Sequence, residues 1–217
     1  MQRTYIDLMD AQERIMVKAT ELFTQRGIKS VTVDQICQGL GISKRTMYEI
    51  FKDKNDLVNC VIASMAEESK RRSFQILDQA ENVMEAMFAL HNYSMSRMNE
   101  VNVIFYEDLK KYYPQLISLF FPKASLPDSF FYTLISKGRE EGIFRSDINP
   151  AIVAEFLQNL IIGIFHSEKV LFECKKTSYE IQVNIMAPYF RGISTEKGLR
   201  ISSKYEEQIL KDLNQIG

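Results

Sequence analysis

The side chains best suited to chemistry gather between positions 26 and 54, where cationic and hydroxyl groups follow one another closely. Six Lys or Arg residues stand there against three acidic residues, a local balance of +3 in a chain whose net charge is −1. Ammonium, guanidinium, hydroxyl and phenol groups bind phosphate oxygens and the edges of nucleic-acid bases. A solvated basic face is the competing interpretation, because charge alone does not identify a partner. The elements that carry these side chains decide between the two.

Two short helices are predicted within this stretch. Thr32 followed by Gln35 has the spacing of a capping box, which predicts a helix over residues 33–40 that ends at Gly41. After a three-residue turn, a second helix is predicted over residues 44–51. This arrangement is typical of a helix-turn-helix, whose second helix enters the major groove of DNA. Short glycine turns also join helices that never touch DNA, but the basic start of the second helix favours the DNA-binding interpretation.

The predicted DNA contacts fall into two groups. Those expected near base edges are Lys44, Arg45 and Glu49, and those expected on phosphates are Thr32, Thr46, Tyr48 and Lys54. Two interpretations of Glu49 remain open: it accepts a hydrogen bond from a cytosine amino group, or it repels phosphates and weakens non-specific binding. Tyr48 also suits a packing role, and Lys54 also suits a solvated helix start.

The stretch from Arg14 to Ile62 resembles the DNA-binding domain of the TetR family of transcriptional regulators. The matching positions are Ala19, Leu22, Phe23, Gly27, Thr32, Ile36, Gly41, Ser43, Thr46, Tyr48, Phe51, Lys54 and Leu57. A looser second match runs from Gly138 to Pro150. The chain departs from the family pattern at Glu49 and Ile50, where many members carry an aromatic residue and a histidine, so the operator sequence cannot be carried over.

The rest of the chain is predicted to be helical, which gives an all-α fold class. We expect a helix-turn-helix DNA-binding domain over residues 1–52 and a larger ligand-binding and dimerisation bundle over residues 53–217. Few Gly and Pro residues interrupt the chain. The further helices are predicted over residues 11–26, 53–80, 83–99, 103–113, 115–121, 128–142, 150–174, 179–190 and 203–216.

One of these helices has two apolar faces. One stripe consists of Ile152, Phe156, Leu160 and Gly163, and the other of Val153, Leu157, Ile161 and Ile164. A helix with two apolar faces needs two partners, so one face is expected in its own subunit and the other in a dimer. The family resemblance implies the same arrangement, a homodimer through the helices from Pro150 to Cys174 and from Tyr179 to Phe190.

A small-molecule site is expected in the C-terminal bundle. Adaptable Met side chains and flat aromatic rings beside a few polar groups suit an apolar or aromatic ligand. The candidate contacts are Met87, His91, Asn92, Met95, Phe105 and Tyr106. Each of them is more simply explained as part of the core.

The sequence gives little support to other classes of function. It holds no Gly-rich phosphate loop after a strand and no Gly-x-Ser-x-Gly motif, and two histidines are few for acid–base catalysis, so we expect neither an enzyme nor a cofactor. Three widely spaced cysteines indicate neither a disulfide framework nor a metal site. No apolar run approaches the ~20 residues of a membrane span, and no secretory signal is recognised, so a cytoplasmic protein is expected.

Taken with the resemblance, these patterns predict a homodimeric repressor that a small ligand releases from a pseudo-palindromic double-stranded DNA operator. The alternative is a ligand-binding or protein-interaction bundle whose helix-turn-helix no longer reads DNA. A helical enzyme that depends on His91 or His166 is a third and weaker hypothesis.

Overall fold

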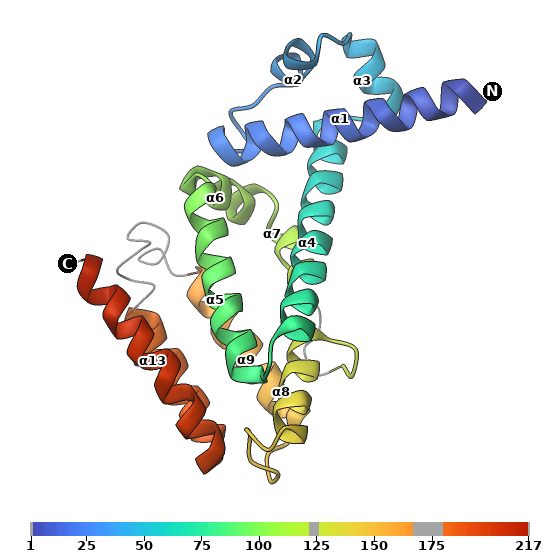
Figure 1. Cartoon of the computed structure of the whole chain (residues 1–217). Helices are drawn as coiled ribbons and strands as arrows, with labels where there is room; N and C mark the ends of the chain where they lie inside the picture. Colours follow the sequence, from blue (N-terminus) through green and yellow to red (C-terminus); the bar gives the residue numbers. More distant parts are fainter. Residues whose placement is uncertain (1, 122–125, 167–179, 217) are drawn as a thin grey trace. The chain divides into compact units, whose positions relative to one another are not determined.

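The computed structural model describes residues 2–121, 126–166 and 180–216 (Figure 1). Its described part is helical, and the only pairing of extended backbone there is an isolated antiparallel bridge between Phe144 and Ser194. The expected all-α fold class is therefore confirmed. The chain forms two compact units, the first from residues 1–69 and 100–120 and the second from residues 70–99 and 121–217.

The helices divide between these units. The first unit holds α1 (Gln2–Arg26), α2 (Val33–Leu40), α3 (Lys44–Ile50), the first turns of α4 (Lys54–Gln79), α6 (Val103–Tyr112) and α7 (Pro114–Ile117). The second unit holds the end of α4, nearly all of α5 (Val83–Glu100), α8 (Phe130–Glu140), α9 (Pro150–His166), the π-helical segment η1 (Gln182–Met186), α12 (Ala187–Ile193) and α13 (Glu196–Ile216).

The core of the first unit follows from the apolar spacing of its helices. The face of α1 that contains Ile15, Ala19 and Phe23 is completely buried, as its i, i+4, i+8 spacing predicts. The first two turns of α4 contribute Leu57 and Val61, which are also fully buried. Each such large side chain stabilises the fold by roughly 1.5–3 kcal/mol relative to an exposed position.

Helix α6 belongs to the first unit because it packs on the end of α1. The backbone N–H of Asn102 donates to the carbonyl of Thr24 at 2.8 Å. Gly27 has a φ of +83°, and a Cβ atom there would stand 2.6 Å from the Cγ2 of Ile104. Only glycine lets the two helices approach this closely. The packing division of the chain therefore differs from the functional boundary expected at residue 52, which stays a prediction.

The core of the second unit lies where α8 packs against α9. Leu134 of α8 and Leu157 of α9 are buried there, together with Ala154. The rings of Phe144 and Phe190 stack against the same cluster, with centroids 6.4 Å apart. Of the two apolar faces predicted for this helix, the one with Leu157 packs in this core, while Phe156 on the other face is largely exposed, so burial of that second face in a dimer stays a prediction.

Some predicted helix boundaries were wrong. Helix α1 begins at Gln2 rather than at position 11, and α13 begins at Glu196 rather than at Ser203. The hydroxyl of Ser203 donates to the carbonyl of Leu199 inside the helix, and Glu206 pairs with Arg191 instead of capping. The helix predicted over residues 179–190 is present from residue 180 onwards, with η1 as a π-helical stretch within it and α12 extending it to Ile193. The end predicted for α9, up to Cys174, lies outside the described residues.

Candidate nucleic-acid interface

The start of α2 is fixed by the predicted capping box. The hydroxyl oxygen of Thr32 accepts from the backbone N–H of Gln35 at 3.3 Å, and the side-chain oxygen of Gln35 accepts from the N–H of Thr32 at 2.8 Å. The box is therefore confirmed. Because Thr32 is exposed and its hydroxyl accepts in this box, its own proton stays available for a phosphate beside the helix N-terminus.

The turn between α2 and α3 is a Schellman motif. Gly41 has a φ of +66°, and its N–H donates to the carbonyl of Gln38 at 3.3 Å. The N–H of Ile42 reaches back to the carbonyl of Cys37 at 3.1 Å. Ser43 then caps α3 by accepting the N–H of Thr46 at 3.1 Å. These local bonds set the direction in which α3 leaves the turn.

Helix α3 has a buried rear and an exposed front. Met47 and the following Phe51 are almost completely buried and hold the helix on the first unit. Tyr48 is 51% exposed, and Lys44 and Arg45 are exposed beside it. The structure thus places the predicted contacts of α3 on an accessible surface, and Figure 1 shows α2 and α3 together beside α1.

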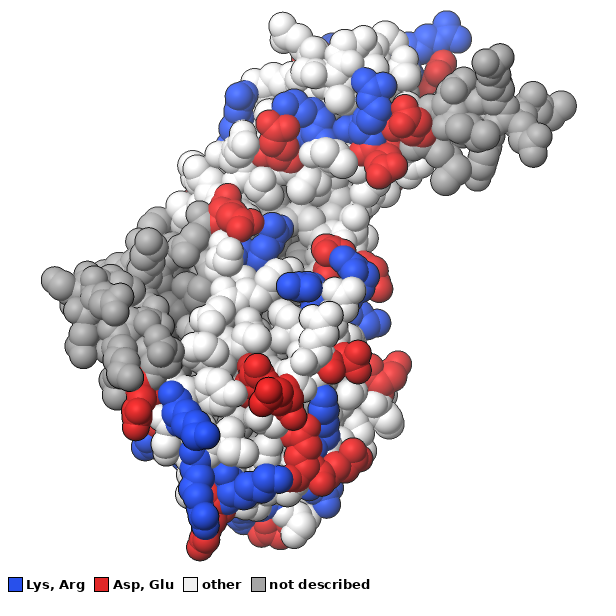
Figure 2. Space-filling model, in the orientation of Figure 1, with Lys and Arg blue, Asp and Glu red and all other residues white. Residues whose placement is uncertain are grey.

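The cationic groups of α3 are held by acidic neighbours. Lys44 Nζ lies 2.6 Å from an Asp34 carboxylate oxygen, and Arg45 Nε donates to Glu49 at 2.9 Å. The hydrogen bond with Asp34 raises the pKa of the Lys44 ammonium. Figure 2 shows acidic and basic atoms side by side on the drawn face of the protein. Exposed pairs of this kind are weak, so they hold these two cations only loosely.

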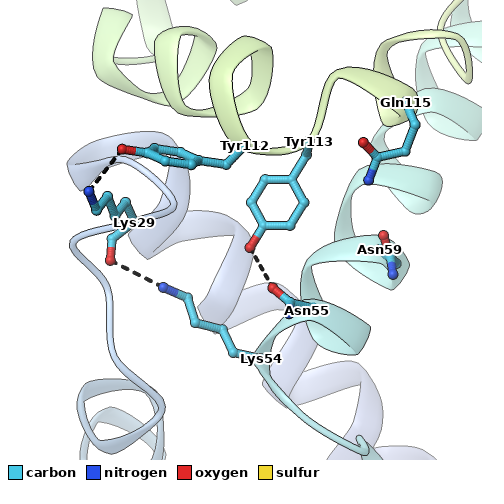
Figure 3. A pocket seen from close by; sticks show the side chains of 7 residues that line it. All are labelled: Lys29, Lys54, Asn55, Asn59, Tyr112, Tyr113 and Gln115. Atoms are coloured by element: carbon cyan, nitrogen blue, oxygen red, sulfur yellow. Dashed lines mark hydrogen bonds between the residues drawn. The ribbon is translucent and has the colours of Figure 1, made fainter.

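Lys54 has a different environment from the other predicted contacts. Its ammonium donates to the carbonyl of Ile28 at 2.6 Å, in the turn after α1. It also donates to the carbonyl of Lys29 at 3.2 Å (Figure 3). Burial lowers its pKa. It ties the start of α4 to this turn, and its predicted contact with a DNA phosphate stays a prediction.

A cavity that sequence reasoning missed opens beside Lys54 in the first unit. This open cavity has a volume of about 590 Å³. The lining residues are Lys29 from the α1–α2 turn, Lys54, Asn55 and Asn59 from α4, and Tyr112, Tyr113 and Gln115 from the end of α6 and α7 (Figure 3). No local motif marks these residues, because three segments far apart in the sequence supply them.

The predicted ligand contacts divide between the two units. Met87, His91 and Asn92 belong to α5 in the second unit, whereas Phe105 and Tyr106 belong to α6 in the first. Phe105 is 1% exposed and packs edge-on against Tyr106, so it is a core residue there.

Around Met87 the second unit has a cavity of about 40 Å³, which is room for about one water molecule. His91 is partly buried, which lowers its pKa. The side chain of Met95 lies outside the described residues. The assignment of ligand contacts on α5 stays a prediction.

The described ranges offer neither a cluster of metal-binding side chains nor a membrane-spanning helix. No three His, Cys, Asp or Glu side chains there form a group able to hold a metal ion. Cys37 and Cys60 are free thiols whose pKa burial raises, and Cys174 lies outside the described residues. None of the described helices combines the length and the apolar character that crossing a bilayer requires.

Comparison with known proteins agrees with this geometry. The family described as "Bacterial regulatory proteins, tetR family" matches residues 15–61, which include α2 and α3. The chain is 25% identical to the HTH-type transcriptional repressor KstR2 of Mycolicibacterium smegmatis, over 68% of this chain and 74% of that protein. It is 22% identical to the HTH-type transcriptional regulator UidR of Escherichia coli strain K12, over 76% and 84% of the two chains.

Solved structures share the fold. A transcriptional regulator from Cytophaga hutchinsonii superimposes with a TM-score of 0.68, at 20% identity, over 84% of this chain and 98% of that one. The capped helix-turn-helix, the exposed face of α3 and the matched family description point to the same function. Residues 15–61 match the DNA-binding domain of the TetR family, and the chain is a DNA-binding transcriptional regulator.

Proposed function

We propose that the protein is a homodimeric repressor that binds a pseudo-palindromic operator and leaves it when a small apolar or aromatic molecule binds. The observation that carries the proposal is the exposed face of α3, with Lys44, Arg45 and Tyr48 on a helix whose rear is anchored by Met47. Such a helix presents base-reading and phosphate-binding groups to a major groove.

The proposed dimer is supported by an apolar face on α9. Ile152 is 56% exposed and Phe156 is 66% exposed, and these residues lie one helical turn apart. A twofold axis brings the same face of a second copy against them and removes both from water. Val183 and Ile185 of η1, also exposed, extend the apolar surface offered by the second unit. Dimerisation would set the two α3 helices about 34–36 Å apart, the spacing of successive major grooves.

The proposed release by a ligand is a shift between two states. A molecule that binds beside Met87 and His91 releases DNA only to the extent that it prefers the state that cannot span both half-sites. Helix α4 begins beside the helix-turn-helix and ends in the second unit, so a change in its position would alter the spacing of the α3 helices.

The proposal is tested by selecting bound duplexes from a random pool with the full chain. Recovered sequences are then measured by mobility shift at two salt concentrations. We expect the selected DNA to be a pseudo-palindrome that two chains bind together. We also expect a screen of metabolites to yield a compound that releases the protein from this DNA. Weak, equally salt-sensitive binding to every duplex would instead indicate a bundle whose helix-turn-helix no longer reads DNA.

A further inference from the structure

We propose that the cavity lined by Lys29, Lys54 and Tyr112 binds a small phosphate-bearing molecule. All of its lining residues belong to the first unit, so the site is complete within one packed body. Its volume of about 590 Å³ falls within the range of small-molecule sites. The site differs in place and in chemistry from the apolar one expected on α5.

The charges of the lining favour an anion. Lys29 and Lys54 are its ionisable cations, and no carboxylate belongs to the lining. Within the described residues neither lysine forms an ion pair: Lys29 Nζ donates to the Tyr112 hydroxyl at 2.8 Å, and Lys54 Nζ donates to main-chain carbonyls. Both partners are neutral, so two positive charges face the cavity without direct neutralisation. A phosphate monoester carries close to two negative charges at neutral pH.

Two carboxylates outside the lining, those of Asp108 and Asp53, act electrostatically on residues of the cavity, but within the described residues neither forms an ion pair with Lys29 or Lys54. Asp108 lies close enough to act on the Lys29 ammonium, but its carboxylate is buried and accepts the backbone N–H of Lys29 at 2.7 Å. The ammonium of Lys111 lies 5.5 Å from the centre of the Tyr112 ring and adds positive charge near the cavity.

The remaining groups supply hydrogen bonds. The Tyr113 hydroxyl donates to the side-chain oxygen of Asn55 at 2.8 Å, which leaves the amide protons of Asn55 for a ligand (Figure 3). Tyr112 accepts from Lys29 and keeps its own hydroxyl proton as a donor. Asn59 and Gln115 add exposed carboxamides. Such donors around a phosphate give short, charge-assisted hydrogen bonds.

The experiment is calorimetric titration of the full chain, without DNA, with inorganic phosphate and with phenyl phosphate at constant ionic strength. We expect saturable binding at one site per chain. Lys29→Gln should weaken it at least about tenfold, because the charge-assisted bonds to the phosphate are lost. Tyr112→Phe should weaken it less, since one hydroxyl is removed and the ring is kept.

Lys52→Gln is the matched control, because Lys52 is an exposed lysine of the same unit outside the cavity. It should change the affinity less than twofold, and thermal melting of all variants checks that they fold. Absence of saturable heat with both probes up to millimolar concentration overturns the proposal, as does an unchanged affinity in Lys29→Gln.

A third result also overturns it and identifies the true partner. If Lys29→Gln leaves the affinity for both phosphate probes unchanged but flattens the salt dependence of DNA binding, Lys29 at this cavity contacts a phosphate of the DNA backbone. Because the titration contains no DNA, a failure to bind phosphate would not contradict the proposed repressor function. Likewise, a failure to select an operator would not contradict the proposed phosphate site.

Discussion

The carboxylate of Asp108 accepts a hydrogen bond from the main-chain N–H of Lys29 at 2.7 Å, although 79 residues separate the two along the chain. The same carboxylate lies 2.9 Å from the point where a Cβ atom on Gly27 would stand. Helix α6 is therefore hydrogen-bonded to the backbone of the turn that leads into α2. This contact fixes the helix-turn-helix against residues that come about eighty positions later.

Removing this carboxylate should destabilise the protein. Asp108→Ala removes a part-buried hydrogen bond to a charged acceptor, and such bonds contribute about 1.5–3 kcal/mol to the free energy of unfolding. Asp108→Asn retains an acceptor oxygen and should lie between wild type and Ala. Urea unfolding at neutral pH measures both. Glu107→Ala, at the exposed neighbouring position, is the control and should stay within about 0.5 kcal/mol. Equal stabilities for Asp108→Ala and the control would contradict the role assigned to this bond.

Two glycines with similar backbone angles should respond differently to alanine. Gly27 and Gly41 have φ values of +83° and +66°, so each substitution costs about 1 kcal/mol or more in backbone strain. At Gly27 the new methyl group also meets Ile104 at 2.6 Å, whereas at Gly41 no atom lies within 4 Å. Gly27→Ala should therefore be the more destabilising variant in the same unfolding assay. A larger loss for Gly41→Ala would mean that α6 does not pack as described.

Local signals in the sequence were sufficient for the helix-turn-helix but not for features that depend on distant contacts. The capping box at Thr32 and the Schellman turn at Gly41 involve residues within six positions, and they gave the bounds of α2 correctly. The start of α13 was missed because Thr195 caps it while its own N–H bonds to the carbonyl of Ile143, 52 residues earlier. Ser203 and Glu206, which lie inside the helix, have the spacing of a capping box and gave the wrong start.

The cavity also depends on contacts between distant residues, so the sequence did not predict it. Lys29 and Tyr112 meet only because α6 packs on the end of α1, and nothing in the spacing of either residue indicates the other. Likewise, Lys54 has the sequence position expected of a phosphate contact, yet its ammonium bonds to the carbonyl of Ile28. Residue type predicted the charge of this side chain correctly, while tertiary packing determined its partners.

Releasing Lys44 from its acidic partner should tighten DNA binding. Asp34→Asn removes the carboxylate that lies 2.6 Å from Lys44 Nζ, and it also removes one negative charge near the DNA phosphates. We expect affinity for operator and non-operator duplexes to rise several-fold at low salt and less at high salt. Fluorescence anisotropy at two salt concentrations measures this. Glu13→Gln, at an exposed position of α1, is the charge-matched control. Unchanged affinity for Asp34→Asn would show that Lys44 does not approach the DNA.

Charge on the exposed face of α9 should break the proposed dimer. Phe156→Glu places a carboxylate where a second copy must bury an apolar side chain, and desolvating that charge is strongly unfavourable. Light scattering should give the mass of one chain, and operator affinity should fall roughly a hundredfold or more as the two half-sites lose their linkage. Glu155→Gln, the exposed neighbour, should stay dimeric. A variant at Phe156 that keeps the dimer mass would place the interface elsewhere.

Acid should destabilise the fold through His91. Burial lowers the pKa of this side chain in the folded protein below its ordinary value near 6.5. The unfolded chain therefore takes up a proton at a higher pH than the folded one, and stability falls as pH drops from about 6.5 towards the folded pKa. Above that window His91 is neutral in both states and contributes no pH dependence. Thermal melting of wild type and His91→Gln between pH 8 and pH 5.5 should show a steeper acid decline for wild type. Parallel curves for the two proteins would mean that His91 is hydrated in the folded state and that its surroundings are not as described.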